Sequence, residues 1–175
     1  HATEIGYNTS LNVVYRDTLR HLIEIDTSGT DAAGCREAMV LLKDELDAAG
    51  LATSLVEIPP EAANGLEGRV ALLARRGWPG QPRLIVYGHI DVVPAEGWDA
   101  FSAVVRDGRI YGRGAADMKG ALAALVAALN GLRDRPLAYD VTVLITMDEE
   151  THQLEQLEYL THALEPGPGP LVITL

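Results

Sequence analysis

The sequence has only one cysteine, Cys35, among its 175 residues. A single thiol excludes an internal disulfide and any zinc site built from several cysteines, and it fits a reducing compartment such as the cytoplasm. We expect Cys35 to pack inside the core of the protein rather than to act as a nucleophile.

Basic residues and long apolar runs are also scarce. Fourteen Lys and Arg residues stand against 25 Asp and Glu residues, for a formal net charge of −11, a balance that repels nucleic acid and anionic membranes and suits cations. No apolar run approaches the roughly 20 residues of a membrane-spanning helix, and the first residues lack the basic and apolar stretches of a signal peptide. We therefore expect a cytoplasmic protein with no nucleic-acid or membrane partner.

Helical and strand patterns alternate along the chain. Apolar residues recur at helical spacing over residues 11–25, 33–49, 118–132 and 152–164. Strand patterns cover residues 51–58, 69–74, 84–87, 141–147 and 171–175, and a hairpin is predicted over residues 104–111. This order predicts one domain of the α/β class, with three layers (α/β/α) around a mixed, mainly parallel sheet.

Three polar clusters lie at the ends of these elements. His89 and Asp91 follow one predicted strand, Asp117 precedes a predicted helix, and Asp148-Glu149-Glu150 follows another strand. Because α/β folds bind their ligands at the carboxyl ends of the strands, we expect the three clusters to converge there. Imidazole and carboxylate groups together form a reasonable zinc ligand set.

Each cluster also has a plain structural alternative. His89 suits a structural histidine, and Asp91 suits an Asx turn. Asp117 suits a helix cap, and the acidic residues 148–150 suit the first turn of a solvated helix. A metal ion accounts for the clusters together, because three carboxylates after a buried strand repel one another unless a cation lies nearby.

The adjacent glutamates Glu149 and Glu150 allow two separate roles. One can bind a metal ion while the other takes a proton from metal-bound water, a division typical of a hydrolase. A phosphate-binding role for Gly112-Arg113-Gly114 fails, because Asp117 replaces the third glycine of the dinucleotide-binding pattern. Serine catalysis lacks its Gly-x-Ser-x-Gly elbow.

The order and spacing of five motifs resemble a known family. The motifs are Gly88-His89-Ile90-Asp91-Val92-Val93-Pro94, Trp98 with Phe101, Asp107-Gly108-Arg109-Ile110-Tyr111-Gly112-Arg113-Gly114, Asp117-Met118-Lys119-Gly120 and Asp148-Glu149-Glu150. They resemble the zinc-dependent amidohydrolases and exopeptidases that include acetylornithine deacetylase, succinyl-diaminopimelate desuccinylase, aminoacylases and glutamate carboxypeptidases.

This resemblance implies a site with two zinc ions, for which Co²⁺ or Mn²⁺ can substitute. By position, His89 binds one zinc ion, Asp117 bridges the two ions and Glu150 binds the other. Glu149 is implied as the general base, which passes the proton of a zinc-bridging hydroxide to the leaving amine. Asp91 is implied to hydrogen-bond the far nitrogen of His89 and to fix its tautomer.

The implied reaction is hydrolysis of an amide or peptide bond in an N-acyl amino acid or a short peptide. Residues 1–175 are implied to be the N-terminal part of the catalytic domain, because the family's later carboxylate, final histidine and lid or dimerisation domain are not visible in the sequence. A homodimer is therefore an option only for a longer parent chain. The alternative is a noncatalytic metal-binding or protein-interaction module derived from such an enzyme.

Some residues imitate the family's ligands without matching their places. Glu165-Pro166 precedes the last predicted strand instead of following it, so we interpret it as a turn. His152 stands where the family commonly has glycine, and we assign it to the first turn of a helix. We assign Trp98 and Phe101 to loop packing.

Overall fold

Helices and strands alternate in the order that the sequence predicts. The computed structural model describes residues 9–29, 32–150, 155–164 and 169–175. The helices are α1 (Thr9–Glu24), α2 (Ala32–Ala48), α3 (Lys119–Gly131) and α4 (Glu155–Leu164), with a short 3-10 helix η1 (Pro60–Ala62). The strands are β1 (Ala52–Glu57), β2 (Val70–Arg76), β3 (Arg83–His89), β4 (Val104–Arg106), β5 (Arg109–Tyr111), β6 (Asp140–Thr146) and β7 (Leu171–Thr174).

Five strands form one mixed sheet in the order β1-β2-β6-β3-β7. β2 pairs antiparallel with β1 and β6, whereas β3 pairs parallel with β6 and β7. Four strands therefore run in one direction and β2 runs against them. The strands β4 and β5 form a separate hairpin, where Asp107 (φ 51°) and Gly108 (φ 72°) take the left-handed conformation of a tight two-residue turn.

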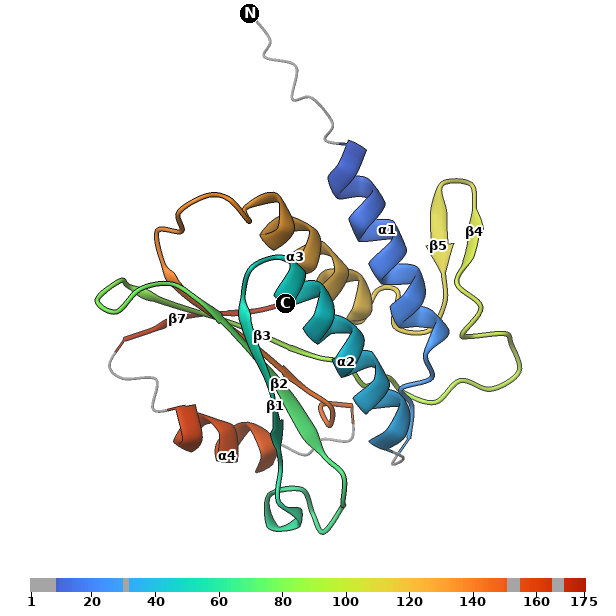
Figure 1. The fold of residues 1–175 in the computed structure, drawn as a ribbon. Coiled ribbons are helices and arrows are strands. Elements are labelled where there is room, and N and C mark those ends of the chain that lie inside the picture. The colour runs from blue at the N-terminus through green and yellow to red at the C-terminus, as the bar shows by residue number, and fades with distance from the viewer. Residues whose placement is uncertain (1–8, 30–31, 151–154, 165–168) are drawn as a thin grey trace, which may run out of the picture.

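Helices cover both faces of the sheet (Figure 1). α2 and α3 lie on one face, where α1 packs on α3, and α4 lies on the other face beside η1. Side chains along β6 alternate between the two faces: Val143 and Ile145 join the core under α2 and α3, and Leu144 joins a smaller cluster with Leu160 of α4. β6 is therefore buried on both faces, as its nearly continuous apolar and β-branched sequence predicts.

The buried side chain of Lys119 joins the end of α1 to the start of α3. Its ammonium group donates to the carbonyl oxygens of Leu22 (2.8 Å) and Ile25 (2.9 Å), at the helix end where carbonyl groups lack helical partners. Burial lowers the pKa of Lys119 to about 8. This lysine therefore fixes the beginning of the helix that follows Asp117.

The predicted elements agree closely with the observed ones. β3 continues to His89, beyond the predicted range 84–87, because its pairing with β6 continues to Thr146. Cys35 lies on the buried face of α2, as predicted, and burial raises the pKa of its thiol to about 12. The predicted helix 152–164 is observed from Glu155, since residues 151–154 lie outside the described ranges. None of the helices described is long and apolar enough to cross a membrane.

Gly34 of α2 lies against the backbone of the preceding segment, where a side chain does not fit. A Cβ atom there would lie 1.8 Å from the carbonyl oxygen of Asp26. We expect Gly34→Ala to lower the free energy of unfolding by about 1–3 kcal/mol, because backbone must move to admit the methyl group. Urea denaturation measures this loss. Gly131→Ala in α3 is the matched control, since its Cβ would meet only side-chain atoms of Leu11, at 3.1 Å or more. Equal losses in the two variants would contradict the prediction.

Candidate metal centre

Three chain segments bring acidic side chains to one histidine at the carboxyl edge of the sheet. His89 ends β3, Glu149 and Glu150 follow the neighbouring strand β6, and Asp117 lies just before α3. His89 Nε2 lies 3.4 Å from Asp117 Oδ1 and 3.7 Å from Glu149 Oε2. Ligand atoms of His89, Glu149 and Glu150 all lie within 4.8 Å of one another. The structure thus brings the three predicted clusters together.

The segment after β3 fixes the orientation of the His89 ring. His89 Nδ1 lies 3.1 Å from the carbonyl oxygen of Asp91. Because a carbonyl oxygen can only accept a hydrogen bond, Nδ1 carries the proton of the neutral ring. The lone pair is then on Nε2, the nitrogen that faces Asp117 and Glu149. A neutral imidazole held in this way is oriented to bind a metal ion through Nε2.

The carboxylate of Asp91 holds the loop that carries the two glutamates. Oδ1 accepts a hydrogen bond from the backbone N–H of Glu149 (3.3 Å), and Oδ2 accepts one from that of Glu150 (2.9 Å). The sequence predicts a contact of Asp91 with His89 alone. In the structure Asp91 Oδ1 lies 3.4 Å from His89 Nδ1, farther than the Asp91 carbonyl oxygen. Asp91, itself buried, therefore contacts both sides of the cluster.

Negative charge dominates the electrostatics of this cluster. Burial lowers the pKa of His89, but the hydrogen bond that the ring donates to Asp91 and the charges of Asp91 and Glu149 outweigh burial and raise the pKa to about 9. Burial, with the charges of Asp117, Asp91 and Glu149, raises the pKa of Glu150 against the opposing effect of His89. A divalent cation would relieve the same repulsion between carboxylates.

The structure contradicts the plain structural alternatives for Asp91, Asp117 and Asp148, whereas Glu149 and Glu150 do lie in a turn, where Glu149 is exposed. Met118, not Asp117, is the N-cap residue of α3; it makes no side-chain capping bond, and the Asp117 side chain is 77% exposed. Asp148 is not part of a solvated turn, because it is buried; burial and the charge of Asp91 raise its pKa to about 7. The amide partners of the Asp91 carboxylate lie after a different strand, so it closes no local Asx turn.

Two aromatic residues of the motifs pack in the loop between β3 and β4. The guanidinium carbon of Arg113 lies 5.8 Å from the ring centroid of Trp98, and the ammonium nitrogen of Lys119 lies 5.9 Å from that of Phe101. The Phe101 contact agrees with the predicted packing role, whereas Trp98 is 51% exposed and packs only in part. His152 and Glu165-Pro166 lie outside the residues that the structure describes.

Thr27 supports the site, and the sequence analysis missed it. Its buried hydroxyl donates to the carbonyl oxygen of Ile90 (2.8 Å), and its own carbonyl oxygen accepts from the backbone N–H of Val92 (3.3 Å). The two bonds hold the backbone on either side of Asp91. No local sequence pattern signals this role, because Thr27 and Ile90 are 63 residues apart.

The donor set fits a divalent metal ion. One imidazole nitrogen and several carboxylate oxygens are donors that zinc accepts in proteins, and the ring orientation of His89 leaves the correct nitrogen available. The fold and this cluster define an α/β protein with a candidate metal centre at the carboxyl edge of its sheet, where α/β proteins commonly bind ligands.

The segment that forms this centre is similar to known sequences. Residues 85–168 match the profile of Peptidase family M20/M25/M40. The chain is 55% identical over 82 residues to a succinyl-diaminopimelate desuccinylase of Acidiphilium cryptum, covering 45% of this chain and 22% of that protein. It is 38% identical over 138 residues to one of Delftia acidovorans, covering 74% of this chain and 34% of that protein. The resemblance predicted from the motifs is confirmed, because the segment that carries them matches the profile of this peptidase family. The chain spans about a third or less of the length of these curated relatives.

Solved structures of hydrolases have the same fold. Human carnosine dipeptidase 1 aligns with a TM-score of 0.82 at 24% identity, over 95% of this chain and 39% of that chain. The M20 family metallo-carboxypeptidase Sso-CP2 from Sulfolobus solfataricus aligns with a TM-score of 0.78 at 25% identity, over 91% of this chain and 36% of that chain. The predicted α/β fold with a mixed sheet is therefore confirmed.

Proposed function

We propose that this chain carries the N-terminal part of the catalytic domain of a metal-dependent hydrolase that cleaves amide bonds. The observation that carries the proposal is the convergence of His89, Asp117, Glu149 and Glu150, with Asp91 in contact with His89 and with both glutamate amides. The family match of the same segment supports it. In this assignment His89, Asp117 and Glu150 would hold zinc.

Glu149 is assigned as the general base. When bound, zinc would polarise the substrate carbonyl and lower the pKa of a water molecule. The Glu149 side chain is 46% exposed, so its carboxylate is accessible from solvent. Its Oε2 atom faces His89 Nε2, which places the carboxylate at the border of the cluster. It takes a proton from the attacking water and delivers it to the amine nitrogen as the carbon–nitrogen bond breaks, so the amine leaves as a neutral group.

The proposed substrates are N-acyl amino acids and short peptides. The sequence relatives are named as desuccinylases of succinyl-diaminopimelate, and the solved relative from Sulfolobus solfataricus is named as a carboxypeptidase. Removal of an acyl group from an amine and removal of a terminal amino acid both require hydrolysis of one amide bond. Glu149 would deliver its proton to the nitrogen of this amide bond in both reactions.

A noncatalytic metal-binding or protein-interaction module is the second candidate. The exposure of the cluster favours it, because the side chains of Asp117 and Glu149 are 77% and 46% exposed in the described part of the chain. A zinc ion bound there would be open to solvent and to a partner. Zinc binding without hydrolysis would indicate this module.

Zinc titration against a chromophoric chelator tests the proposed ligand set. We expect the chain to bind zinc, and His89→Ala to bind it at least about tenfold more weakly, because a ligand atom is lost. His21→Ala is the matched control, since His21 lies in the last turn of α1 and is exposed. This control should keep the zinc affinity of the unchanged protein. Equal affinities of His89→Ala and the unchanged protein would contradict the ligand assignment.

Release of free amine tests the reaction separately from metal binding. N-succinyl and N-acetyl amino acids and dipeptides are incubated with zinc-loaded and zinc-free protein. We expect amine release only from the zinc-loaded sample. If zinc-loaded protein releases no amine, the result would contradict the proposed hydrolase and favour the noncatalytic module.

A further inference from the structure

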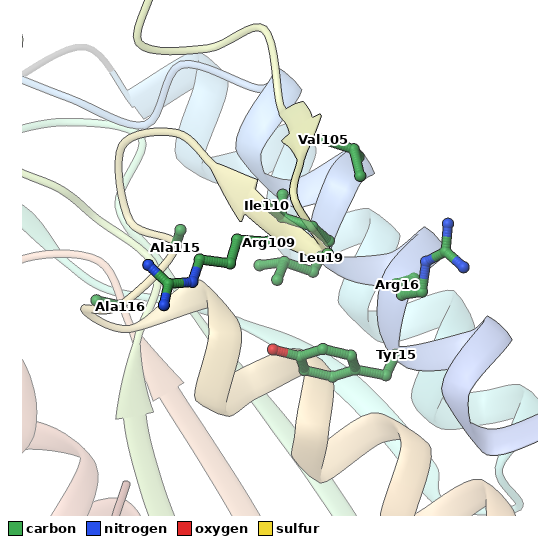
Figure 2. Close-up of a pocket in the computed structure, with 9 residues that line it drawn as sticks. Tyr15, Arg16, Leu19, Val105, Arg109, Ile110, Ala115 and Ala116 are labelled. Carbon is green, nitrogen blue, oxygen red and sulfur yellow. The ribbon is translucent and has the colours of Figure 1, made fainter. Parts of the chain in front are cut away.

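A second concave site lies between α1, the hairpin β4–β5 and the segment that precedes Asp117 (Figure 2). We refer to it as the hairpin pocket; its walls come from Tyr15, Leu19, Arg109, Ile110, Ala115 and Ala116, with Arg16 at its rim. Its volume of ≈ 570 Å³ lies within the range of about 300–1,000 Å³ that small-molecule sites occupy.

Arg109, an exposed residue of β5, extends its charge across this pocket. Figure 2 shows its side chain extending from β5 across the pocket, so that the guanidinium group lies beside Ala115 and Ala116. Among the described residues this guanidinium has no hydrogen-bond or ion-pair partner, whereas Arg36 pairs with Glu57 and Arg75 pairs with Asp140. In a chain with 25 acidic and 14 basic residues, such an arginine is available to an external anion.

The other walls of the pocket supply a hydroxyl group and apolar surface. The Tyr15 side chain extends from α1 toward α3 in Figure 2, and its hydroxyl oxygen lies 3.9 Å from the point that a Cβ atom on Gly120 would occupy. Leu19 and Ile110 supply apolar surface to the lining of the pocket. The Arg16 guanidinium is turned outward, so Arg109 is the cation inside the pocket.

We propose that the hairpin pocket binds a small organic monocarboxylate with a short apolar chain. The planar guanidinium of Arg109 matches the two oxygens of a carboxylate, and such charge-assisted pairs are the strongest hydrogen bonds available to a side chain. The apolar chain of the ligand lies on Leu19 and Ile110. The Tyr15 hydroxyl is the further polar group that the pocket offers to the ligand.

The charge of the chain selects a singly charged ligand over a phosphate. The chain has a formal net charge of −11, which repels a dianion more strongly than a monoanion, and a single guanidinium inside the pocket balances one negative charge. The pocket also borders the candidate metal centre. Ala116 immediately precedes Asp117, so a bound ligand contacts the segment that carries an acidic residue of that centre.

Titration with n-hexanoate tests this site. Metal-stripped and desalted protein is used, so that the probe has no metal ion to bind and the result does not depend on the proposed hydrolase. We expect saturable shifts of the backbone amide signals of Ile110, Ala115 and Ala116 in nitrogen-15 NMR spectra. Hexan-1-ol has the same chain without the charge and should bind about tenfold more weakly. Equal binding of the two probes, or shifts that do not saturate, would overturn the proposal.

Two arginine variants on the same hairpin locate the charge that binds the probe. Arg109→Gln should weaken hexanoate binding about tenfold and leave hexan-1-ol binding unchanged. Arg106→Gln is the matched control, because the backbone of Arg106 lies opposite that of Arg109 in the hairpin. The Arg106 guanidinium lies 5.0 Å from the Tyr111 ring centroid, and Arg106 is not among the residues that line the pocket. The control should bind hexanoate as the unchanged protein does. An equal loss in both variants, or no loss in Arg109→Gln, would contradict the proposal.

Discussion

Replacing Glu149 with glutamine should lower kcat for amide hydrolysis by about 10²–10⁴-fold while zinc remains bound. The magnitude is that of a lost general base, because an amide side chain cannot accept and return a proton near neutral pH. Zinc binding should persist, because His89, Asp117 and Glu150 keep the ligand atoms assigned to the metal. The measurements are kcat from the rate of amine release and zinc affinity from chelator competition.

Two further glutamate variants make this prediction specific. Glu150→Gln should lower zinc affinity as well as kcat, since Glu150 is assigned as a ligand and not as the base. Glu96→Gln should change neither quantity, because Glu96 is exposed in the loop after β3. Retention of full activity in Glu149→Gln would remove Glu149 from the mechanism. Loss of zinc from the same variant would reassign it as a ligand.

Replacing Asp91 with asparagine should weaken zinc binding about 10–100-fold, the usual cost of losing a group that orients metal ligands. Asparagine keeps one oxygen and replaces the other with an N–H donor. That donor would face the backbone N–H of Glu149 or Glu150, which now loses its acceptor. The loop that carries both glutamates should therefore shift. An amide group left unsatisfied at this buried position should also lower the free energy of unfolding by about 1–3 kcal/mol.

Asp99→Asn is the matched control for Asp91→Asn. Asp99 is exposed, and the hydrogen bond that it accepts, from the Ser102 hydroxyl, uses its backbone carbonyl oxygen. Zinc competition and urea denaturation should give the values of the unchanged protein for this control. A merely structural role for Asp91 would lower stability without weakening zinc binding to the folded protein. That outcome would contradict the positioning role.

Most of the fold could be predicted from the sequence because its local signals are strong. The turn at Asp107-Gly108, the alanine- and leucine-rich helix that became α3 and the apolar run of β6 each have one favoured local structure. The neighbours of each strand could not be predicted in this way. β6 lies between β2 and β3 although α3 and the hairpin separate it from them in the chain, and that order depends on packing between distant segments.

The convergence of the candidate ligand side chains could be predicted, but their supports could not. His89 and Glu150 stand in recognisable motifs at strand ends, and the neighbouring positions of β3 and β6 bring them together. The hydrogen bonds from the amides of Glu149 and Glu150 to Asp91 depend on that pairing and on backbone groups that every sequence contains. Lys119 illustrates the same limit, because its partners are carbonyl groups nearly a hundred residues earlier in the chain.

Asp91 holds the loop after β6 through main-chain groups, so the position of that loop does not depend on the side chains that it carries. Its carboxylate binds the main-chain amides of residues 149 and 150 and leaves their side chains uncommitted. We therefore expect substitutions of the two glutamate side chains to change the proposed chemistry of the site while the loop keeps its place, because the bonds to Asp91 use only main-chain groups.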